Sequence, residues 1–235
     1  MIKTTGSVQD RKLKTRRLTL FAMLLCVELL LIFTPLGFVP VGPVNATTLH
    51  IPVILAAILM GPLEGSALGL VFGLSSLIKN TIAPTITSFV FSPFYSLGEF
   101  RGNGWSVWIA LGPRILLGLF AALLFRFLRD TLKKPTLAAG LAAGVSTLLH
   151  TAMVMGSIYL FFGRDYAAAR QIGQSALLTI IGTVILTNGV AELIIAAIVA
   201  MGVYRFSAKR GTAKAAKLPK TADAALNGKD EPHHE

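Results

Sequence analysis

The sequence places several ionisable side chains inside long apolar segments, where a charge is costly. They are Glu28, Lys79, Arg114, His150 and Glu192. An ionisable residue at membrane depth by default marks a transport pathway or a binding site. Arg114 is the strongest candidate for contact with a ligand, because its guanidinium is permanently charged and its planar fork suits a carboxylate.

Structural roles are the alternative for these side chains. Glu192 would serve only to hold helices together if it formed an ion pair with Arg114 or His150. Lys79 would take no part in a site if its amine extended to the interface on the outer side of the membrane. The sequence alone leaves these alternatives open.

Motifs that hold nucleotides or metals are absent from the sequence. There is no Gly-x-x-x-x-Gly-Lys, no HExxH and no Cys/His cluster with metal-ligand spacing. His150 has no acidic partner at a fixed spacing, which a catalytic set of nucleophile, base and orienting group would require. We therefore expect the protein not to be an enzyme and to hold no cofactor and no metal.

The elements that must position these residues are membrane helices. Of the 235 residues, 54% are hydrophobic and 14% are charged, whereas soluble domains carry roughly a quarter charged residues. Apolar segments separated by helix breakers predict an all-α, polytopic integral membrane protein with six transmembrane helices. The predicted helices are 18–34, 47–60, 62–79, 105–128, 136–162 and 172–205.

The basic residues predict which side of the membrane each end faces. Of the 22 Lys and Arg residues, 17 lie before Leu18, in 126–134 or from Arg205 onward. Basic residues gather on the cytoplasmic side, so we expect both termini in the cytoplasm and the chain in the cell membrane. The expected parts are a basic segment at 1–17, a membrane domain at 18–205 and a disordered cytoplasmic tail at 206–235.

This topology brings polar residues from several helices to one level of the bundle. Those expected in the outer half or near the midplane are Glu28, His50, Lys79, Asn80, Arg114, His150, Asn188 and Glu192. The last two are four residues apart, so they share one face of their helix. We therefore predict a substrate-binding site between the midplane and the outer surface.

The loop at 80–104 is unusually aromatic. The rings in it and just beyond it are Phe89, Phe91, Phe94, Tyr95, Phe100, Trp105 and Trp108. One interpretation is an aromatic belt at the membrane interface. The other is a lid that folds over the pocket and excludes water, since long loops are often functional.

Small residues at regular spacing predict close helix contacts. Gly61, Gly65, Gly69 and Gly73 recur every fourth residue and form a stripe against which another helix can pack closely. We expect that helix to belong to the same chain. Ala22 and Cys26 form a shorter pair of this kind in the cytoplasmic half of the first helix.

Several short motifs together resemble one transporter family. They are VNATTLHIPVIL at 44–55, ILMGP at 58–62, GLVFGLS at 69–75 and TSFVFSPF at 87–94. The sequence resembles the S components of energy-coupling factor (ECF) transporters, and among them the pantothenate-type branch. The likeness covers 18–205, with its specific motifs in 44–94.

The resemblance implies a six-helix subunit that supplies specificity to an ABC importer. It implies that the substrate is a small water-soluble vitamin, with pantothenate as the leading candidate. The subunit would bind this vitamin from outside, and its first loop would close over it. It also implies a membrane coupling protein (the T component) and two ATPase subunits as partners.

Individual residues carry over from the family at a few positions. The family's first-loop contacts fall on the segment that ends at Asn45, with His50 as a neighbour. An Ala-x-x-x-Ala motif of the first helix docks on the coupling protein, and Ala22 and Cys26 occupy that place here. Cys26 departs from the motif but is small enough for close helix approach.

Other functions remain as alternatives. The vitamin could differ from pantothenate. A stand-alone, ion-coupled secondary transporter would use Glu28 and Glu192 as proton carriers, although six helices without an obvious inverted repeat are few for such a device.

Overall fold

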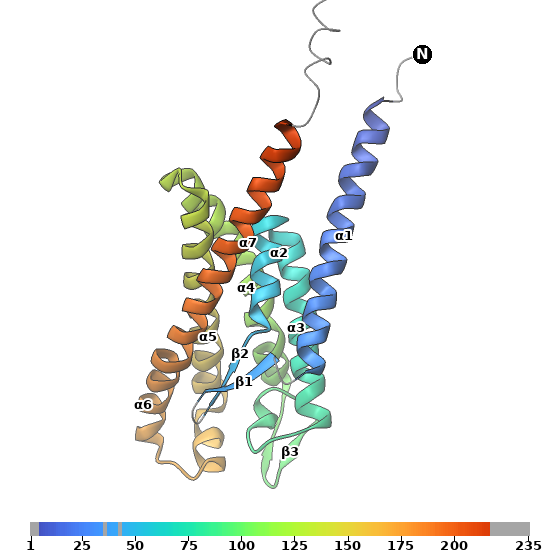
Figure 1. Ribbon diagram of the computed structural model, residues 1–235. Helices are drawn as coiled ribbons and strands as arrows, with labels where there is room; N and C mark the ends of the chain where they lie inside the picture. The colour runs from blue at the N-terminus through green and yellow to red at the C-terminus, as the bar shows by residue number, and fades with distance from the viewer. Residues whose placement is uncertain (1–4, 35–36, 42–43, 217–235) are drawn as a thin grey trace, which may run out of the picture.

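The computed structural model describes residues 5–34, 37–41 and 44–216. Nearly all of this part is helical, and the helices run side by side along one axis (Figure 1). In chain order the elements are α1 Thr5–Phe33, β1 Phe38–Val41, β2 Val44–Thr47, α2 His50–Leu59, α3 Pro62–Ile82, the 3-10 turn η2 Ser88–Val90, β3 Ser96–Leu97, β4 Phe100–Arg101, α4 Gly104–Leu132, α5 Pro135–Ala169, α6 Gln174–Val184, the π-helical turn η3 Ile185–Gly189 and α7 Val190–Ala216.

Several of these helices are suited to a membrane. Within the described residues, three helical stretches are long and apolar enough to cross one, namely Gly104–Leu132, Pro135–Ala169 and Gln174–Lys209. Helix α2 is apolar but has 10 residues, a length of about 15 Å at the usual rise. The protein is thus a helical membrane protein, and the count of six spans stays a prediction.

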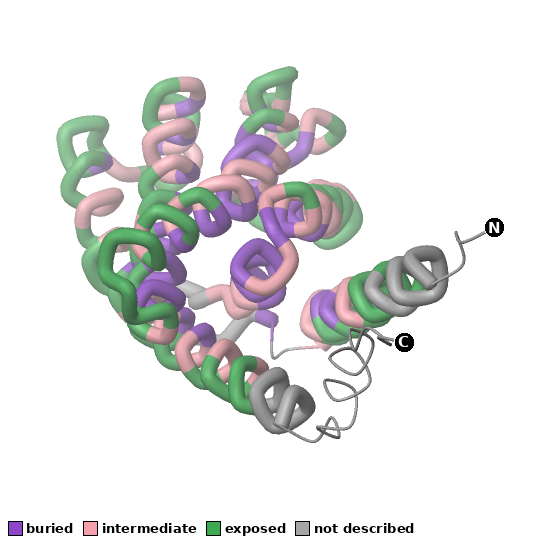
Figure 2. The backbone as a smooth tube through the Cα atoms, turned by 90° about the horizontal axis from the view of Figure 1, so that it is seen from above, coloured by how far each residue is buried: buried purple, intermediate pink, exposed green. Residues whose placement is uncertain are grey.

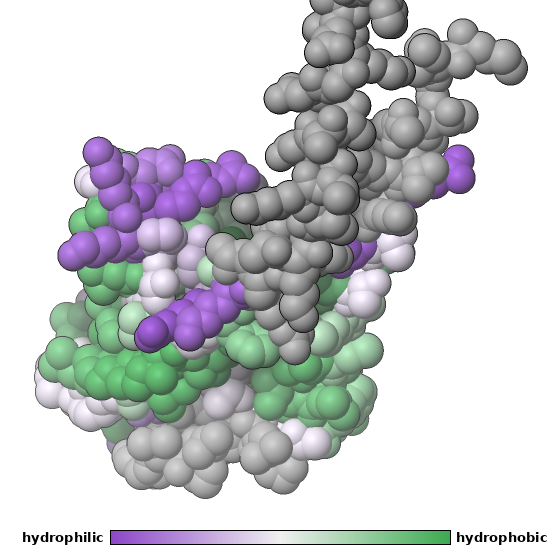
Figure 3. All heavy atoms as spheres, turned by 45° about the horizontal axis from the view of Figure 1, so that its top comes forward, coloured by the Kyte–Doolittle hydropathy of each residue, from purple (hydrophilic) through white to green (hydrophobic). Residues whose placement is uncertain are grey.

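The two described chain ends lie at the same end of the bundle. The beginning of α1 and the end of α7 both lie there, and the two β-hairpins and the α5–α6 turn lie at the opposite end (Figure 1). The α4–α5 turn, with Lys133 and Lys134, lies at the end that holds the chain ends. Hydrophilic residues gather at that end, above a hydrophobic band (Figure 3). This arrangement agrees with the distribution of basic residues in the sequence.

Helix α2 is the centre of the bundle. Eight of its ten residues are buried, and it packs against α1, α3, α4 and α7. Helix α1 lies at the edge, as the view from above shows (Figure 2). Its main contacts are with α2 and α3. Leu24 is buried in the apolar core, and the α1 residues that pack against that core are Leu20, Phe21, Leu25, Leu31 and Ile32.

Glycines bring α3 and α4 into close contact. A Cβ atom on Gly69 would lie 2.1 Å from the carbonyl oxygen of Arg114, and one on Gly65 would lie 3.0 Å from that of Gly118. Gly73 is equally close to the backbone of α4. The structure therefore confirms that the glycine stripe serves packing within the chain, except for Gly61, which precedes α3 with a φ of 124°.

Several of the predicted helix bounds need correction. The second helix begins at His50 rather than at residue 47, because Val44–Thr47 pairs with β1 as an antiparallel strand. The third helix continues to Ile82. The fifth continues to Ala169, which leaves Arg170–Gly173 as its connection to α6.

Helical structure also reaches into both predicted flanking segments. Helix α1 begins at Thr5, within the predicted segment 1–17, and α7 ends at Ala216, within the predicted tail 206–235. Residues 217–235 of that tail lie outside the described residues.

Candidate functional site

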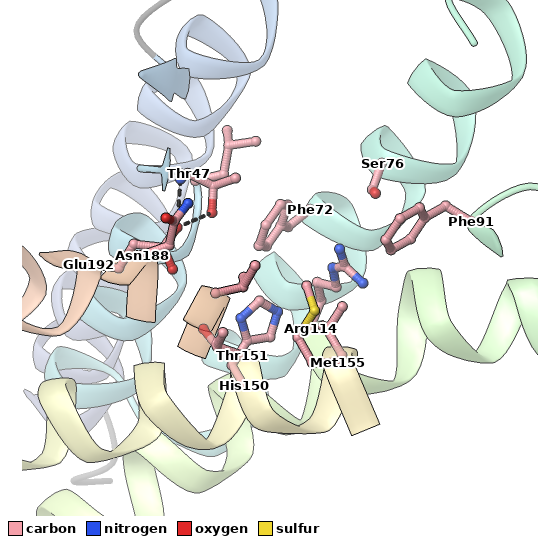
Figure 4. Close-up of a pocket in the computed structure, with 13 residues that line it drawn as sticks. Thr47, Phe72, Ser76, Phe91, Arg114, His150, Thr151, Met155, Asn188 and Glu192 are labelled. Carbon is pink, nitrogen blue, oxygen red and sulfur yellow. Dashed lines mark hydrogen bonds between the residues drawn. The ribbon is translucent and has the colours of Figure 1, made fainter. Parts of the chain in front are cut away.

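A cavity of about 210 Å³ lies between α3, α4, α5 and the α6–η3–α7 rod, toward the end that carries the hairpins. Its apolar lining consists of Leu49, Phe72, Phe91, Val154, Met155 and Val184. Its polar lining consists of Thr47, Ser76, Arg114, His150, Thr151, Asn188 and Glu192 (Figure 4). An apolar cavity with a few converging polar groups is the usual form of a small-molecule site.

Arg114 extends from α4 into this cavity and is 7% exposed. Its guanidinium carbon lies 5.4 Å from the ring centroid of Phe72 and 5.5 Å from that of Phe91, distances at which a cation is attracted to an aromatic face. One terminal nitrogen donates a hydrogen bond to the Ile109 carbonyl oxygen. The side chain is therefore held between two rings and one backbone group.

No carboxylate neutralises Arg114 within the described part of the chain. The ion pairs found there are Arg17–Glu64 and Arg129–Asp130, both far from the cavity in sequence and in place. A buried cation without a counter-ion is unfavourable. The site thus contains a positioned positive charge that an anionic ligand would neutralise.

Glu192 contacts Thr47, and not Arg114 or His150 as an ion pair between helices would require. Its Oε1 accepts a hydrogen bond from the Thr47 backbone N–H at 2.7 Å and one from the Thr47 hydroxyl at 3.3 Å. Thr47 is the last residue of β2, so this contact joins the first hairpin to α7 at one side of the cavity (Figure 4). Glu192 is 8% exposed.

The π-helical turn η3 lies where α6 meets α7, beside the cavity. Both Val184, just before it, and Asn188, within it, line the cavity, as does Glu192 one turn later. A π turn widens the helix locally and is often found at functional sites. Asn188 and Glu192 thus reach one cavity from one face, as their spacing predicted.

His150 contributes an imidazole from α5. Its ring centroid is 6.1 Å from that of Phe72, and its Nε2 has no hydrogen-bond partner among the described residues. With Thr151 beside it, it offers polar groups to the middle of the cavity.

The remaining predicted residues lie outside the cavity lining. His50 is buried at the start of α2, next to Leu49. Asn80 accepts a hydrogen bond from Ser88 at 2.7 Å and donates one to the Ser76 carbonyl at 2.8 Å, so it holds the following loop onto α3. Asn45 pairs with Pro40 through the backbone of β2, and its side chain lies outside the described residues.

Two of the ionisable residues are also placed away from the cavity. Glu28 is fully buried on α1, and neither carboxylate oxygen has a hydrogen-bond partner in the described part of the structure. Lys79 is exposed in the last turn of α3. Neither residue lines the cavity.

Comparison with known proteins identifies the family. A family model described as "ECF transporter, substrate-specific component" matches residues 16–204. The chain belongs to this family. It is also 40% identical, over 157 residues, to the pantothenic acid transporter PanT of Lactococcus lactis subsp. cremoris (strain MG1363), with 66% of this chain and 74% of that protein covered. The resemblance seen in the motifs at 44–94 is thereby confirmed.

The aromatic loop of this substrate-specific component has both buried and exposed rings. Phe91 lines the cavity, and Phe89 is fully buried, 5.9 Å from the rings of both Phe100 and Phe162. In contrast, Phe94 and Trp105 are 78% and 52% exposed. One side of the loop covers the cavity and the other faces the surroundings of the bundle.

Sequence reasoning missed several lining residues. They are Thr47, Leu49, Phe72, Ser76, Thr151, Val154, Met155 and Val184. A signal existed for some, because Phe72 and Ser76 are four residues apart on α3, and His150, Thr151, Val154 and Met155 share one face of α5. Thr47 gave no signal, since the sequence assigned it to the second helix.

The predicted docking pair of the substrate-specific component lies on the outer surface of α1. Ala22 and Cys26 are both exposed, and neither packs into the core of the bundle. Apolar neighbours on the same helix, Met23 and Leu30, are 55% and 64% exposed. This surface is open to lipid or to another membrane protein.

Proposed function

We propose that this chain is the pantothenate-binding subunit of an ECF-type ABC importer in the cell membrane. In this role it takes the vitamin from outside and delivers it inward with a coupling protein and two ATPase subunits. The observation that carries the proposal is Arg114, a buried guanidinium that lies in the cavity and has no carboxylate partner among the described residues.

The chemistry of pantothenate matches the cavity from end to end. Its carboxylate must find a cation when it leaves water, and Arg114 offers a charge-assisted, bidentate hydrogen-bonding surface. Its hydroxyl groups and amide need neutral donors and acceptors. Asn188, beside Glu192, supplies these at the other end, and Thr151, beside His150, supplies a hydroxyl group in the middle. The 40% identity to a pantothenic acid transporter supports the same ligand.

Topology and partners complete the proposal. The bundle has six spans with both termini in the cytoplasm, and the cavity opens toward the outside beneath the first hairpin. Ala22 and Cys26 form the small-residue surface of α1 on which the coupling protein docks. The chain itself supplies substrate specificity, and the ATPases supply the energy.

Mass spectrometry of small molecules that co-purify with the protein tests this proposal directly. The protein is purified in a mild detergent from cells grown with pantothenate, biotin, thiamine and riboflavin in the medium. We expect pantothenate to be retained, and unlabelled pantothenate to displace a radiolabelled sample. Retention of another vitamin, with no binding of pantothenate, would overturn the assignment.

A further inference from the structure

We propose that Pro113 is a positioning residue for ligand recognition, because it frees the backbone group that holds Arg114 in the cavity. The binding test of this inference rests on the proposed function. A second test, described below, does not depend on the identity of the ligand.

Pro113 lies in the interior of α4, nine residues after the helix begins at Gly104. A residue at this position would normally donate its backbone N–H to the carbonyl oxygen of Ile109, four residues earlier. Proline has no N–H, and its ring pushes that carbonyl aside. Ile109 is fully buried, so water does not replace the missing donor.

The Arg114 side chain supplies that donor. One of its terminal nitrogens donates to the Ile109 carbonyl oxygen, which satisfies a buried acceptor that would otherwise be costly. The proline and the arginine are adjacent. The same turn of α4 therefore leaves the Ile109 carbonyl without its backbone donor and carries the side chain that donates to it instead.

This arrangement fixes the guanidinium without neutralising it. A carboxylate partner would hold Arg114 equally well but would compete with an anionic ligand for the charge. A carbonyl oxygen, with Phe72 and Phe91 at 5.4 and 5.5 Å, orients the group and leaves its positive charge available. Preorganised charge of this kind lowers the cost of ordering the side chain when the ligand binds.

The variant Pro113→Ala tests the inference. Alanine restores a backbone N–H that competes for the Ile109 carbonyl, so the guanidinium loses its anchor. We expect the affinity for pantothenate to fall by about tenfold, the scale of one hydrogen bond to a charged group. Binding of pantothenol, in which a neutral alcohol replaces the carboxylate, should change by less than about threefold.

Two controls separate positioning from a general structural effect. Pro135→Ala removes the exposed proline at the first position of α5, where the N–H has no helical partner in any case, and should leave both affinities unchanged. In an Arg114→Gln background, Pro113→Ala should cause no further loss of pantothenate affinity. Equal loss for acid and alcohol, or full additivity, would contradict the inference.

A ligand-free structure of the variant provides the independent readout. We expect the residue 113 N–H on the Ile109 carbonyl and the Arg114 guanidinium displaced from it. An unmoved guanidinium would overturn the inference whichever vitamin the protein binds. Pro113→Gly, which also restores the N–H, serves the same comparison if the alanine variant is not recovered folded. Failure of the wild type to bind pantothenate refutes the proposed function and leaves this structural readout to decide the inference.

Discussion

At the scale of single residues, Glu192 has a role distinct from that of Arg114. Its carboxylate accepts from the Thr47 backbone N–H at 2.7 Å and so ties the end of the first hairpin to α7. Residue Thr47 is 145 positions away in sequence. The contact joins this hairpin to α7 just after the π turn that carries Asn188, and Thr47, Asn188 and Glu192 all line the cavity. We therefore expect Glu192 to affect how long a ligand stays bound.

Glu192→Ala should increase the rate at which pantothenate dissociates by about tenfold, because a charge-assisted hydrogen bond to the hairpin is lost. Glu192→Gln keeps an acceptor oxygen and should change the rate by less than about threefold. Thr47→Val is the matched control, since it removes the 3.3 Å hydroxyl contact but retains the backbone donor. Chase of radiolabelled ligand measures the rates, and an unchanged rate for the alanine variant would refute this role.

The site was partly predictable from residue types. Ionisable side chains on apolar segments identified Arg114, His150 and Glu192, because such groups are costly in a membrane and by default mark a site. The same criterion also selected Glu28 and Lys79, which lie away from the cavity. The partner of Glu192 could not be predicted, since it depends on a hairpin contact between distant segments. The hydrogen bond from Arg114 to the Ile109 carbonyl could not be predicted either, because sequence patterns report on side chains and not on unpaired backbone groups.

At the scale of elements, the contact of α3 with α4 sets the position of Arg114. Gly69 touches the Arg114 carbonyl, so the two helix backbones meet at the turn that carries the guanidinium. Close approach through small residues is a usual source of helix association in membranes. The packing of α3 is therefore coupled to the geometry of the site.

Gly69→Ala should destabilise the protein by about 1–3 kcal/mol, since the added methyl group would lie 2.1 Å from a backbone oxygen and the helices must separate. Gly156→Ala on α5 is the matched control, because its added methyl group meets no atom within 4 Å. Thermal unfolding in detergent, followed by the loss of monodisperse protein, compares the two variants. A Gly69→Ala variant as stable as Gly156→Ala would contradict the packing account.

Long elements were predicted better than short ones. Apolar length alone placed α4 and α5, whose interiors hold no long polar interruption. It failed at Val44–Thr47, because the strand and the helix that follows it are both apolar and cannot be separated by length. The π turn at Ile185–Gly189 was also hidden, since one extra residue in a turn leaves no mark on hydrophobic periodicity.

At the scale of the whole molecule, the outward surface of α1 is available for a partner. Helix α1 lies at the edge of the bundle, with Ala22 and Cys26 exposed on it (Figure 2). The cavity is lined by other elements. Ligand binding and partner docking should therefore be separable by mutation.

Ala22→Trp should leave the affinity for pantothenate unchanged and abolish uptake, because a large side chain keeps another helix at a distance. Ala152→Trp places the same bulk on an exposed position of α5 and should leave uptake intact. Radiolabelled uptake into cells that express the complete importer, beside binding to the purified subunit, measures both effects. Normal uptake by the Ala22→Trp variant would place the docking surface elsewhere.

The central claim is that Arg114 recognises the carboxylate of the ligand. Isothermal titration calorimetry of the wild type and Arg114→Gln, each with pantothenate and pantothenol, tests it most directly. Pantothenol should bind the wild type more weakly than pantothenate does. We expect the substitution to weaken pantothenate binding by at least about tenfold and pantothenol binding by less than about threefold. Equal losses for the acid and the alcohol would show that Arg114 supports the fold and would contradict the claim.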